Sequence, residues 1–500
     1  MSSSSPALNA AIAAHRFGLG EASLDVVQPD AAAWLLAQIG PADTAVGDGL
    51  LSTRQALALV VAERETRQRA RNPLPGQTAE QVLAGHYRPT LLADARSHLL
   101  TAAATERPFA ERLQLFWANH FTVSLSKGAT RGLIGAFERD AIRPNIAGPF
   151  EALLLASTTH PAMLRYLDNA LSAGPNSQRV SRAARRAARQ PDEMRAPRIT
   201  GLNENLAREV LELHTLGAEA ARSGVYTQAD VTAFAAVLTG WRVDLQDAES
   251  GDTSDTGDTL PLFNDAWHEP GRKTVLGKSY PAGAEALRMV LHDLALHPAT
   301  ARFVATKLAR HFVADDPPPA LVSRLTATYL RSNGELAPVY RELVRSPEAW
   351  NPQPAKLKTP EEFVLSALRV LRPGEPFYER GDTVKQFYER GDTAKQFHER
   401  GDTASALGIT TLGQRIHAAP SPAGWSDRAA DWLGPDAVWK RVEWATRTAA
   451  RMGPSTDARA LAARSLGPLL SAATQAQIER AADGTQALAL LLMAPEFQRR

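Results

Sequence analysis

The 500-residue sequence contains no cysteine. This absence excludes disulfides, thiolate nucleophiles, iron–sulfur clusters and cysteine-ligated zinc. Any metal site must therefore use histidine, aspartate, glutamate or asparagine. An excess of charge of one sign is also missing, because 56 Lys and Arg residues face 54 Asp and Glu residues. We therefore expect no bulk electrostatic attraction to nucleic acid or to an anionic membrane.

Long apolar runs are missing as well. No stretch approaches the roughly 18 uninterrupted apolar residues that a transmembrane helix needs. The N-terminal segment has no basic region and no apolar region of the secretory type, since His15 and Arg16 interrupt its Ala/Ile stretch. We therefore expect a cytoplasmic protein. Serine-hydrolase, P-loop and Rossmann motifs are also absent, so no motif identifies a reaction.

Alanine, leucine and arginine dominate the composition, and apolar residues recur at three- and four-residue spacing through most of the chain. This pattern predicts a mainly α fold, a multi-helix globular body with long loops and at most a minor β-hairpin. The hairpin arm is expected at 273–277. Helices are predicted over 107–120, after a capping box that begins at Thr227, and from Pro298 to about Phe312.

Three segments interrupt the helical pattern. Residues 179–198 carry seven arginines, and residues 244–258 are rich in Asp, Ser, Thr and Gly, so both are predicted to be surface loop insertions. A tandem repeat of ten residues, FYERGDTVKQ and two near copies, starts at Phe377 and lengthens a linker. The chain is therefore expected to comprise a main helical body, a repeat linker and a C-terminal helical unit packed on the body: residues 1–372, 373–404 and 405–500.

The densest polar cluster lies in residues 201–217, which we predict to be a helix. Val210 and Leu213 mark its apolar face. His214 and Asn203 project to the border of that face, where a polar group must find a partner or cost a few kcal/mol. The opposite arc is polar and includes three carboxylates: Glu204, Glu209 and Glu212.

Other polar residues stand among large apolar ones elsewhere in the sequence, and we expect several of them to converge with this cluster where helices meet. The catalytic candidates are His120, His160, Asp168, Glu212 and His214. The candidate metal ligands are His120, His160, Glu209 and His214. The binding candidates are Trp117, Asn119, Arg139, Asn169, Asn203, Glu204, His268, Lys307 and His311.

Three interpretations of these residues stay open. Two or three imidazoles with a carboxylate can hold Zn²⁺, Mn²⁺ or Fe²⁺, or can serve as a general acid/base pair without metal. Against a metal, helical ligand pairs usually follow H-x-x-x-H or E-x-x-H spacing, and Glu209-x-x-Glu212-x-His214 fits neither. Core histidines and asparagines more commonly satisfy helix ends and loops.

Ordered motifs along the chain are similar to those of a known family. They include Arg16-Phe-Gly-Leu-Gly20, Phe116-Trp-Ala-Asn-His-Phe121, Glu138-Arg139, Lys307-Leu-Ala-Arg-His-Phe312 and Ser421-Pro-Ala-Gly-Trp425. The chain resembles, nearly end to end, the bacterial family known as domain of unknown function 1800. This resemblance implies one continuous, mostly helical unit and no settled activity. The tandem repeat is not part of the family pattern, which favours an insertion.

The resemblance also suggests a partner. Genes of this family often neighbour those of another family of unknown function, number 1501, which looks like the sulfatase and alkaline-phosphatase superfamily and tends to carry an export leader. This association implies joint action with the phosphatase-like protein on a polymeric or anionic substrate, and it makes a periplasmic location shared with an exported partner the alternative to the cytoplasm. Together with the candidate residues above, it leads to the hypothesis of an enzyme with a buried His/Asp/Glu site, in one version dependent on a divalent metal ion. The alternative is a non-catalytic helical partner or chaperone of the phosphatase-like protein.

Overall fold

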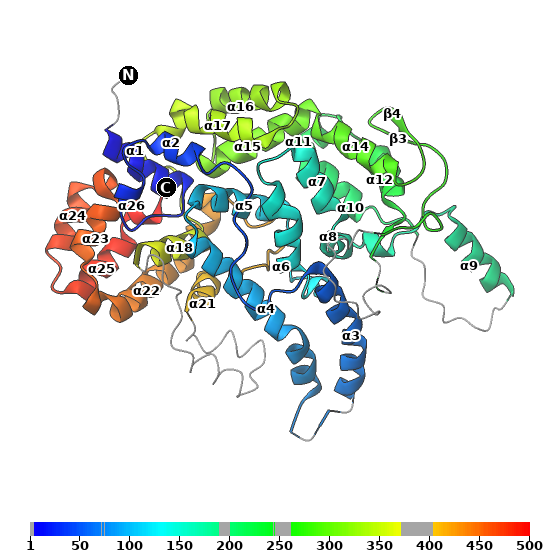
Figure 1. The fold of residues 1–500 in the computed structure, drawn as a ribbon, viewed down its shortest axis with the longest axis horizontal. Helices are drawn as coiled ribbons and strands as arrows, with labels where there is room; N and C mark the ends of the chain where they lie inside the picture. The colour runs from blue at the N-terminus through cyan, green and yellow to red at the C-terminus, as the bar shows by residue number, and fades with distance from the viewer. Residues whose placement is uncertain are drawn as a thin grey trace.

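The computed structural model describes residues 5–71, 73–74, 76–189, 201–243, 245, 262–371 and 404–500. As predicted, the fold is mainly α (Figure 1). The first half contains α1 (Pro6–Ile12), α2 (Ala31–Leu36), α3 (Thr53–Arg71), α4 (Ala79–Ala104), α5 (Pro108–His120), α6 (Ile134–Phe137), α7 (Phe150–Thr159), α8 (Pro161–Tyr166), α9 (Gln178–Arg189), α10 (Asn205–Glu209), α11 (Ala218–Arg222) and α12 (Gln228–Leu238). The second half contains α14 (Glu285–Ala295), α15 (Pro298–Phe312), α16 (Pro319–Arg331), α17 (Leu336–Arg345), α18 (Pro360–Leu371), α21 (Ala404–Thr411), α22 (Pro435–Met452), α23 (Ala458–Ser465), α24 (Ala472–Glu479), α25 (Gly484–Met493) and α26 (Pro495–Gln498).

The predicted helix starts are confirmed where local signals set them. Helix α12 begins with the expected capping box, in which Thr227 and Asp230 satisfy backbone groups reciprocally. Helix α15 begins at Pro298, and the preceding His297 caps it by accepting the N–H of Ala299. Helix α5 covers the predicted segment from 107 to 120.

Two small antiparallel strand pairs accompany the helices. The predicted hairpin arm is β3 (Lys273–Val275), which pairs with β4 (Lys278–Tyr280). A second pair, β1 (Trp241–Arg242) with β2 (Leu262–Phe263), was not expected, because two-residue strands carry no period-2 pattern. None of the described helices combines the length and hydropathy needed to span a membrane.

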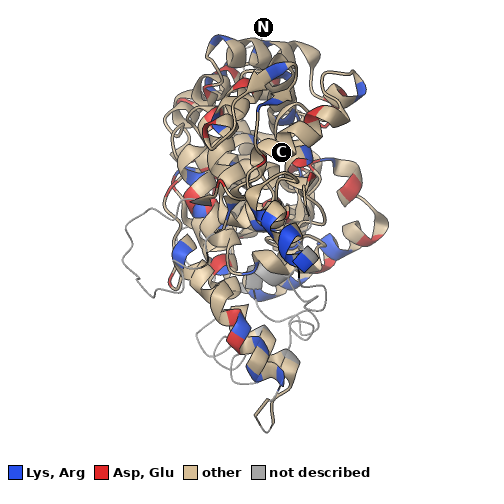
Figure 2. Cartoon of the chain, turned by 90° about the vertical axis from the view of Figure 1, so that its right-hand side faces the viewer, with Lys and Arg blue, Asp and Glu red and all other residues tan. Residues whose placement is uncertain are grey.

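The arginine-rich segment corrects one prediction. We expected a loop over 179–198, but α9 makes residues 178–189 helical and projects from the body (Figure 1). Its alternation of arginine and alanine supplies strong helix formers without glycine or proline. Basic residues occupy successive turns of this helix (Figure 2). The rest of that segment, nearly all of 244–258 and the repeat lie outside the described residues.

Buried apolar side chains form two cores. The larger core draws on residues between Ala10 and Ala349. The smaller core joins α18 to the helices from α21 onward, so α18 packs with the C-terminal helices although it precedes the repeat. Paired backbone hydrogen bonds join Arg500 to Lys356, which precedes α18, and His15 near the N-terminus contacts the carbonyl of Ser465 in the C-terminal part. The proposed division at residue 372 stays a prediction.

Within the described ranges, three stretches of π-helix interrupt the α-helical pattern: η1 (Ala13–Phe17), η4 (Glu138–Ile142) and η7 (Val210–Thr215). Such turns are rare, and they occur often at functional sites. One of them falls inside the predicted helix 201–217 and changes its register. Leu213, expected on the apolar face, is partly exposed, whereas Leu211 is fully buried.

Candidate functional site

The structure brings two of the predicted histidines together. His120 ends α5, His214 lies in η7, and both are buried. The Nε2 atom of His120 lies 3.1 Å from the carbonyl oxygen of His214, and the ring centres are 6.1 Å apart. Burial, followed by the positive charge of Lys307 from α15, lowers the pKa of His214 to about 3 and that of His120 well below its usual value. Both imidazoles are therefore neutral near pH 7.

His160 belongs to a different set of contacts. Its Nδ1 atom accepts the N–H of Ala162 and so caps α8. Its Nε2 atom lies 3.0 Å from Thr53 Oγ1, and that hydroxyl donates to Asp140 at 2.5 Å. The ring also packs against Phe137. His160 thus has the helix-end role that was one of the open interpretations.

The predicted carboxylates have partners of their own. Asp168 pairs with Lys127, and a third of each side chain is exposed. Burial and the neighbouring charge of Glu212 raise the pKa of Glu209, and both glutamates are partly exposed. Within the described ranges, no group of three His, Asp or Glu donors close enough to share a metal ion includes any of these residues or the two paired histidines.

The predicted asparagines connect helices to neighbouring backbone. Asn119 exchanges two hydrogen bonds with the backbone of Trp425, at 2.9 and 2.7 Å. Asn169 donates to the carbonyl of Leu238 at the end of α12. Asn203 accepts a backbone N–H in the first turn of α10. These contacts position the elements around the histidines.

Three further binding candidates, Trp117, Arg139 and Glu204, are also bonded within the protein. Trp117 Nε1 donates to the hydroxyl of Tyr340 at 2.6 Å. Arg139 pairs with Asp94 at 3.0 Å. Glu204 is held at the surface by hydrogen bonds from side chains of α10 and α12. These residues serve packing and helix junctions in this structure.

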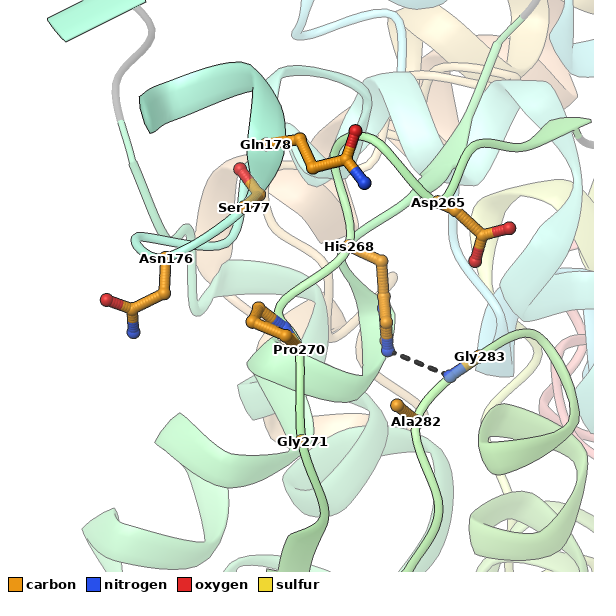
Figure 3. A pocket seen from close by; sticks show the side chains of 9 residues that line it. All are labelled: Asn176, Ser177, Gln178, Asp265, His268, Pro270, Gly271, Ala282 and Gly283. Atoms are coloured by element: carbon orange, nitrogen blue, oxygen red, sulfur yellow. Dashed lines mark hydrogen bonds between the residues drawn. The ribbon is translucent and has the colours of Figure 1, made fainter. Parts of the chain in front are cut away.

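His268 lines a surface pocket of about 310 Å³. Its Nδ1 atom donates to the carbonyl of Thr239 at 2.7 Å, and its Nε2 atom accepts the N–H of Gly283 at 3.0 Å (Figure 3). Lys273 Nζ lies 2.9 Å from the same Nε2 atom. The imidazole is thus fully engaged in the pocket wall. The other lining residues are Asn176, Ser177, Gln178, Asp265, Pro270, Gly271, Ala282 and Gly283.

Lys307 and His311 lie one turn apart on α15, as their spacing predicted. His311 Nδ1 lies 3.1 Å from Asp427 Oδ2. Burial lowers the pKa of Lys307 to about 8, although the charge of Asp427 opposes the shift. With a pKa of about 8, Lys307 is still mostly protonated at pH 7. Its side chain is partly exposed, and its charge acts on both buried histidines, His120 and His214.

A second cluster was not among the predicted sites. His98 from α4, Glu138 from η4 and His417 from the segment after α21 place three donor atoms within 4.8 Å of one another. Nδ1 of His98 lies 3.5 Å from one Glu138 oxygen, and Nε2 of His417 lies 3.2 Å from the other. Their side chains are 7–14% exposed. In the described part of the chain this is the only such donor group.

A fourth side chain completes this cluster. Glu361 accepts a hydrogen bond from His98 Nε2, on the opposite edge of the ring from Glu138. Gln414 holds Glu361 in place, because its Nε2 donates to the carboxylate and its Oε1 accepts the backbone N–H of Glu361, both at 3.0 Å. The ring of His98 is thereby fixed between two carboxylates.

The electrostatics of this cluster differ from those of the first. Burial lowers the pKa of His98, but the charges and hydrogen bonds of Glu361 and Glu138 outweigh it and raise the pKa to about 10. Burial raises the pKa of Glu138, but the two imidazoles outweigh it and hold that pKa well below its usual value. Without a metal the cluster is a buried imidazolium–carboxylate network.

His417 carries two further signs of a site. Its backbone has φ +56°, a left-handed conformation that is uncommon outside glycine and costs of order 1–3 kcal/mol. Its buried Nε2 atom has no aligned hydrogen-bond partner in the described structure, although Glu138 is only 3.2 Å away. Sequence reasoning missed this cluster because its members are widely separated in the chain. Only the Glu138-Arg139 motif gave a signal, through the family resemblance.

Fold and clusters define a mainly α protein with buried histidine sites at the junctions of its helices. The chain belongs to the family described as "Protein of unknown function (DUF1800)", whose model matches residues 12–499. No curated protein and no solved structure matches the chain. The function must therefore be argued from the residues themselves.

Proposed function

We propose that this protein binds a divalent transition metal ion through His98, Glu138 and His417, and that the bound metal supports hydrolytic chemistry. The observation that carries the proposal is the convergence of two imidazoles and a carboxylate, within 4.8 Å, from three separate parts of the chain. Two His with one Glu is a known ligand set of catalytic zinc.

The spacing of the donor atoms supports this proposal. Two ligand atoms on a tetrahedral Zn²⁺, with bonds of about 2.1 Å, lie roughly 3.4 Å apart. The contacts of Glu138 with His98 and His417 measure 3.5 and 3.2 Å. His417 Nε2 and the Glu138 oxygen are close but not aligned for a hydrogen bond. This geometry is expected if both atoms point to a common ion rather than to each other.

Glu361 would act in the outer sphere. By accepting the proton of His98 Nε2 it leaves the Nδ1 lone pair of His98 free to bind a metal. Such carboxylate–histidine pairs fix the tautomer and raise the basicity of the ligand. Gln414, which holds Glu361, stands three residues before the ligand His417, so one short segment supplies both.

Three protein ligands leave a coordination position for water, as in catalytic rather than structural zinc sites. A bound divalent metal lowers the pKa of such a water to near 7 and thereby supplies a hydroxide nucleophile. The protein's own residues would hold the ion, balance its charge with Glu138 and Glu361, and keep the surroundings dry. The substrate class remains the anionic one suggested by the phosphatase-like neighbour family.

Elemental analysis of protein purified without chelators or a histidine tag tests the proposal. We expect about one equivalent of Zn, Mn or Fe, and at least a 100-fold loss of affinity in His417→Ala. Glu361→Gln should weaken binding by about 10- to 100-fold without abolishing it. His292→Ala is the matched control, because His292 also pairs with a glutamate but is half-exposed.

A double variant, His120→Ala with His214→Ala, decides between the two clusters. It should retain the metal if the ion sits at Glu138. No stoichiometric metal in the parent, even after Zn²⁺ is added back, would refute the proposal. Metal lost from the double variant but kept by His417→Ala would move the site to the first cluster.

A second candidate function, that of a non-catalytic partner of a phosphatase-like protein, has support from one surface. Leu433, Val438 and Trp439, at the start of α22, are 41–66% exposed. Exposed aromatic and aliphatic side chains that lie together are typical of binding surfaces. Mixing the protein with a purified member of family 1501 should give a complex that Trp439→Ala weakens. Failure of the parent to associate at micromolar concentration would exclude this candidate.

A further inference from the structure

The cluster around His120 and His214 poses a question that the metal proposal does not answer. Both ring nitrogens of His214 and the Nδ1 atom of His120 are buried without a hydrogen-bond partner in the described structure. The two side chains are 1% and 2% exposed. A buried polar atom without a partner costs about 1–3 kcal/mol, so three in one place indicate that a bound group is part of this site.

The protein's own hydrogen bonds define what such a group must provide. His120 Nε2 lies against the carbonyl of His214, so this nitrogen carries the proton of the neutral ring. A neutral His214 has one N–H donor and one acceptor, and neither is used. Of the three orphaned atoms, one is therefore an N–H donor, on His214, and two are acceptors, the other nitrogen of His214 and Nδ1 of His120.

Lys307 adds a positive charge to the same place. Its charge lowers the pKa of both histidines, and its ammonium group lies 5.6 Å from the ring centre of Phe303. The carboxylate whose charge reaches Lys307, Asp427, is already engaged by His311 and by two other cations. Its oxygens lie 3.1 Å from His311, 3.6 Å from Lys356 and 3.6 Å from Arg500.

The walls of the site are aromatic. His120 packs against Trp117, Phe121 and Phe303, with ring centres 4.6–6.1 Å away. Such walls exclude water, and the low local dielectric strengthens the attraction between Lys307 and an anion. Lys307 itself is partly exposed.

We propose that Lys307 and His214 form a binding site for a small oxyanion, such as the carboxylate or phosphate group of a ligand. The anion accepts hydrogen bonds from the ammonium group and from the one N–H of His214, and the acid proton of a protonated oxyanion or a co-bound water donates to the two ring acceptors. The anion also balances a cation whose carboxylate neighbour, Asp427, is already paired with Lys356 and Arg500. A metal ion does not fit here, because the ammonium repels it and no carboxylate balances it. Water alone would satisfy the rings but would leave the charge of Lys307 uncompensated.

The π-helical turn η7 explains how the site arises. The extra residue per turn rotates the segment after Glu209, so His214 turns into the core beside Phe121, at 5.0 Å between ring centres. In a regular helix His214 would lie on the border of the apolar face. The rare backbone thus occurs where it places an imidazole without a partner, as expected for a site with a bound ligand.

Calorimetric titration of the full chain with inorganic phosphate, sulfate and acetate, in a zwitterionic buffer with chloride, tests the proposal. We expect saturable binding of at least one of these anions. Lys307→Met should weaken it at least tenfold, and Lys307→Arg, which keeps the charge, should change it only severalfold. Lys278→Met is the matched control, since Lys278 also lies near an aromatic ring, at 5.8 Å, but pairs with Asp293.

Each outcome decides a point. Phosphate and sulfate binding without acetate assigns a tetrahedral oxyanion, and acetate alone assigns a carboxylate. His214→Phe should also abolish binding, whereas Glu138→Gln should leave it intact, which separates this site from the metal cluster. No binding of any of the three anions at about 1 mM, or equal binding by Lys307→Met, would overturn the proposal and leave water as the occupant.

Discussion

The two buried histidine clusters show how neighbouring charge decides what an imidazole can do. His98 and His214 are both buried, and burial lowers the pKa of each. Next to Glu138 and Glu361 the pKa of His98 nevertheless rises to about 10, whereas next to Lys307 that of His214 falls to about 3. Burial alone therefore does not set the charge state of a core histidine.

This difference has a consequence for ligands. The cluster at Glu138 combines two carboxylates with two imidazoles. When a metal ion displaces the imidazole protons, the negative charges of the carboxylates remain to balance the ion, so this cluster suits a cation. The cluster at Lys307 has a cation and neutral rings, so it suits an anion. One segment contributes to both, because His417 belongs to the first cluster and Asp427 lies beside the second.

Removal of the central carboxylate should have the largest effect. In metal-free protein Glu138→Gln removes the carboxylate that lies between the two imidazoles and leaves His98 paired with Glu361 alone. Breaking a buried pair costs roughly 3–5 kcal/mol. Urea unfolding at pH 7 measures the change in the free energy of unfolding. Glu151→Gln is the control, since Glu151 pairs with the half-exposed His292 at 2.7 Å, and a surface pair contributes about 0–1 kcal/mol. Equal losses in the two variants would mean that the cluster is not effectively buried.

The segment shared by the two clusters can be disturbed at one glycine. Gly424 has φ +82°, and a Cβ there would lie 2.6 Å from Asn119 Oδ1 and 2.8 Å from Thr122 Oγ1. Left-handed strain and overpacking together should make Gly424→Ala about 2–4 kcal/mol less stable. Metal content and anion affinity should fall together, as measured by the elemental analysis and the calorimetric titration described above.

Gly413 provides the comparison for that variant. It also has a positive φ, +98°, but a Cβ there would meet nothing within 4 Å. Gly413→Ala should therefore cost only about 1–2 kcal/mol, the backbone penalty alone. If the two variants lose equal stability, the close approach of Gly424 to α5 is not a constraint.

The sequence predicts the features whose signals lie close together in the chain, and it misses the features that depend on residues far apart in the chain. Helices α12 and α15 follow from caps and prolines that lie within one turn of their starts. His120 and His214 were expected to converge, His214 because it projects to the border of an apolar face and His120 because it stands among large apolar residues. The cluster at Glu138 could not be predicted, since its ligands are 40 and 279 residues apart in the chain and none lies at a metal-ligand spacing from another.

Two other failures have local causes. The many arginines of residues 179–198 suggest a solvent-exposed loop, but arginine and alanine both favour helix, and α9 forms there. The π-helical turn η7 breaks the regular rotation of about 100° per residue after Glu209. A projection that assumes a regular α-helix therefore places Leu213 on the wrong side. Backbone irregularities of this kind carry no sequence period, and here they fall at both proposed sites.

A change of pH should reveal the depressed pKa of His214. The unfolded chain binds a proton at this residue near pH 6.5, whereas the folded protein does so only near pH 3. Between these values the unfolded state holds more protons, so stability is fully present above pH 6.5 and is lost as the pH falls. Between pH 7.5 and 5 the parent should lose about 2 kcal/mol more than His214→Phe. Parallel losses in oxyanion-free buffer would show that His214 titrates normally.

The smallest effect should come from that same variant at pH 7.5. His214→Phe removes two ring nitrogens that have no hydrogen-bond partner and places an aromatic ring beside Phe121. Replacement of an unsatisfied polar group by an apolar one of similar shape is close to neutral, so the free energy of unfolding should change by less than about 1 kcal/mol. The contrast with Glu138→Gln then distinguishes His214, whose ring would bind a ligand, from His98, whose ring is hydrogen-bonded to carboxylates of the protein itself. A loss above about 2 kcal/mol in anion-free buffer would mean that His214 already has a partner inside the fold.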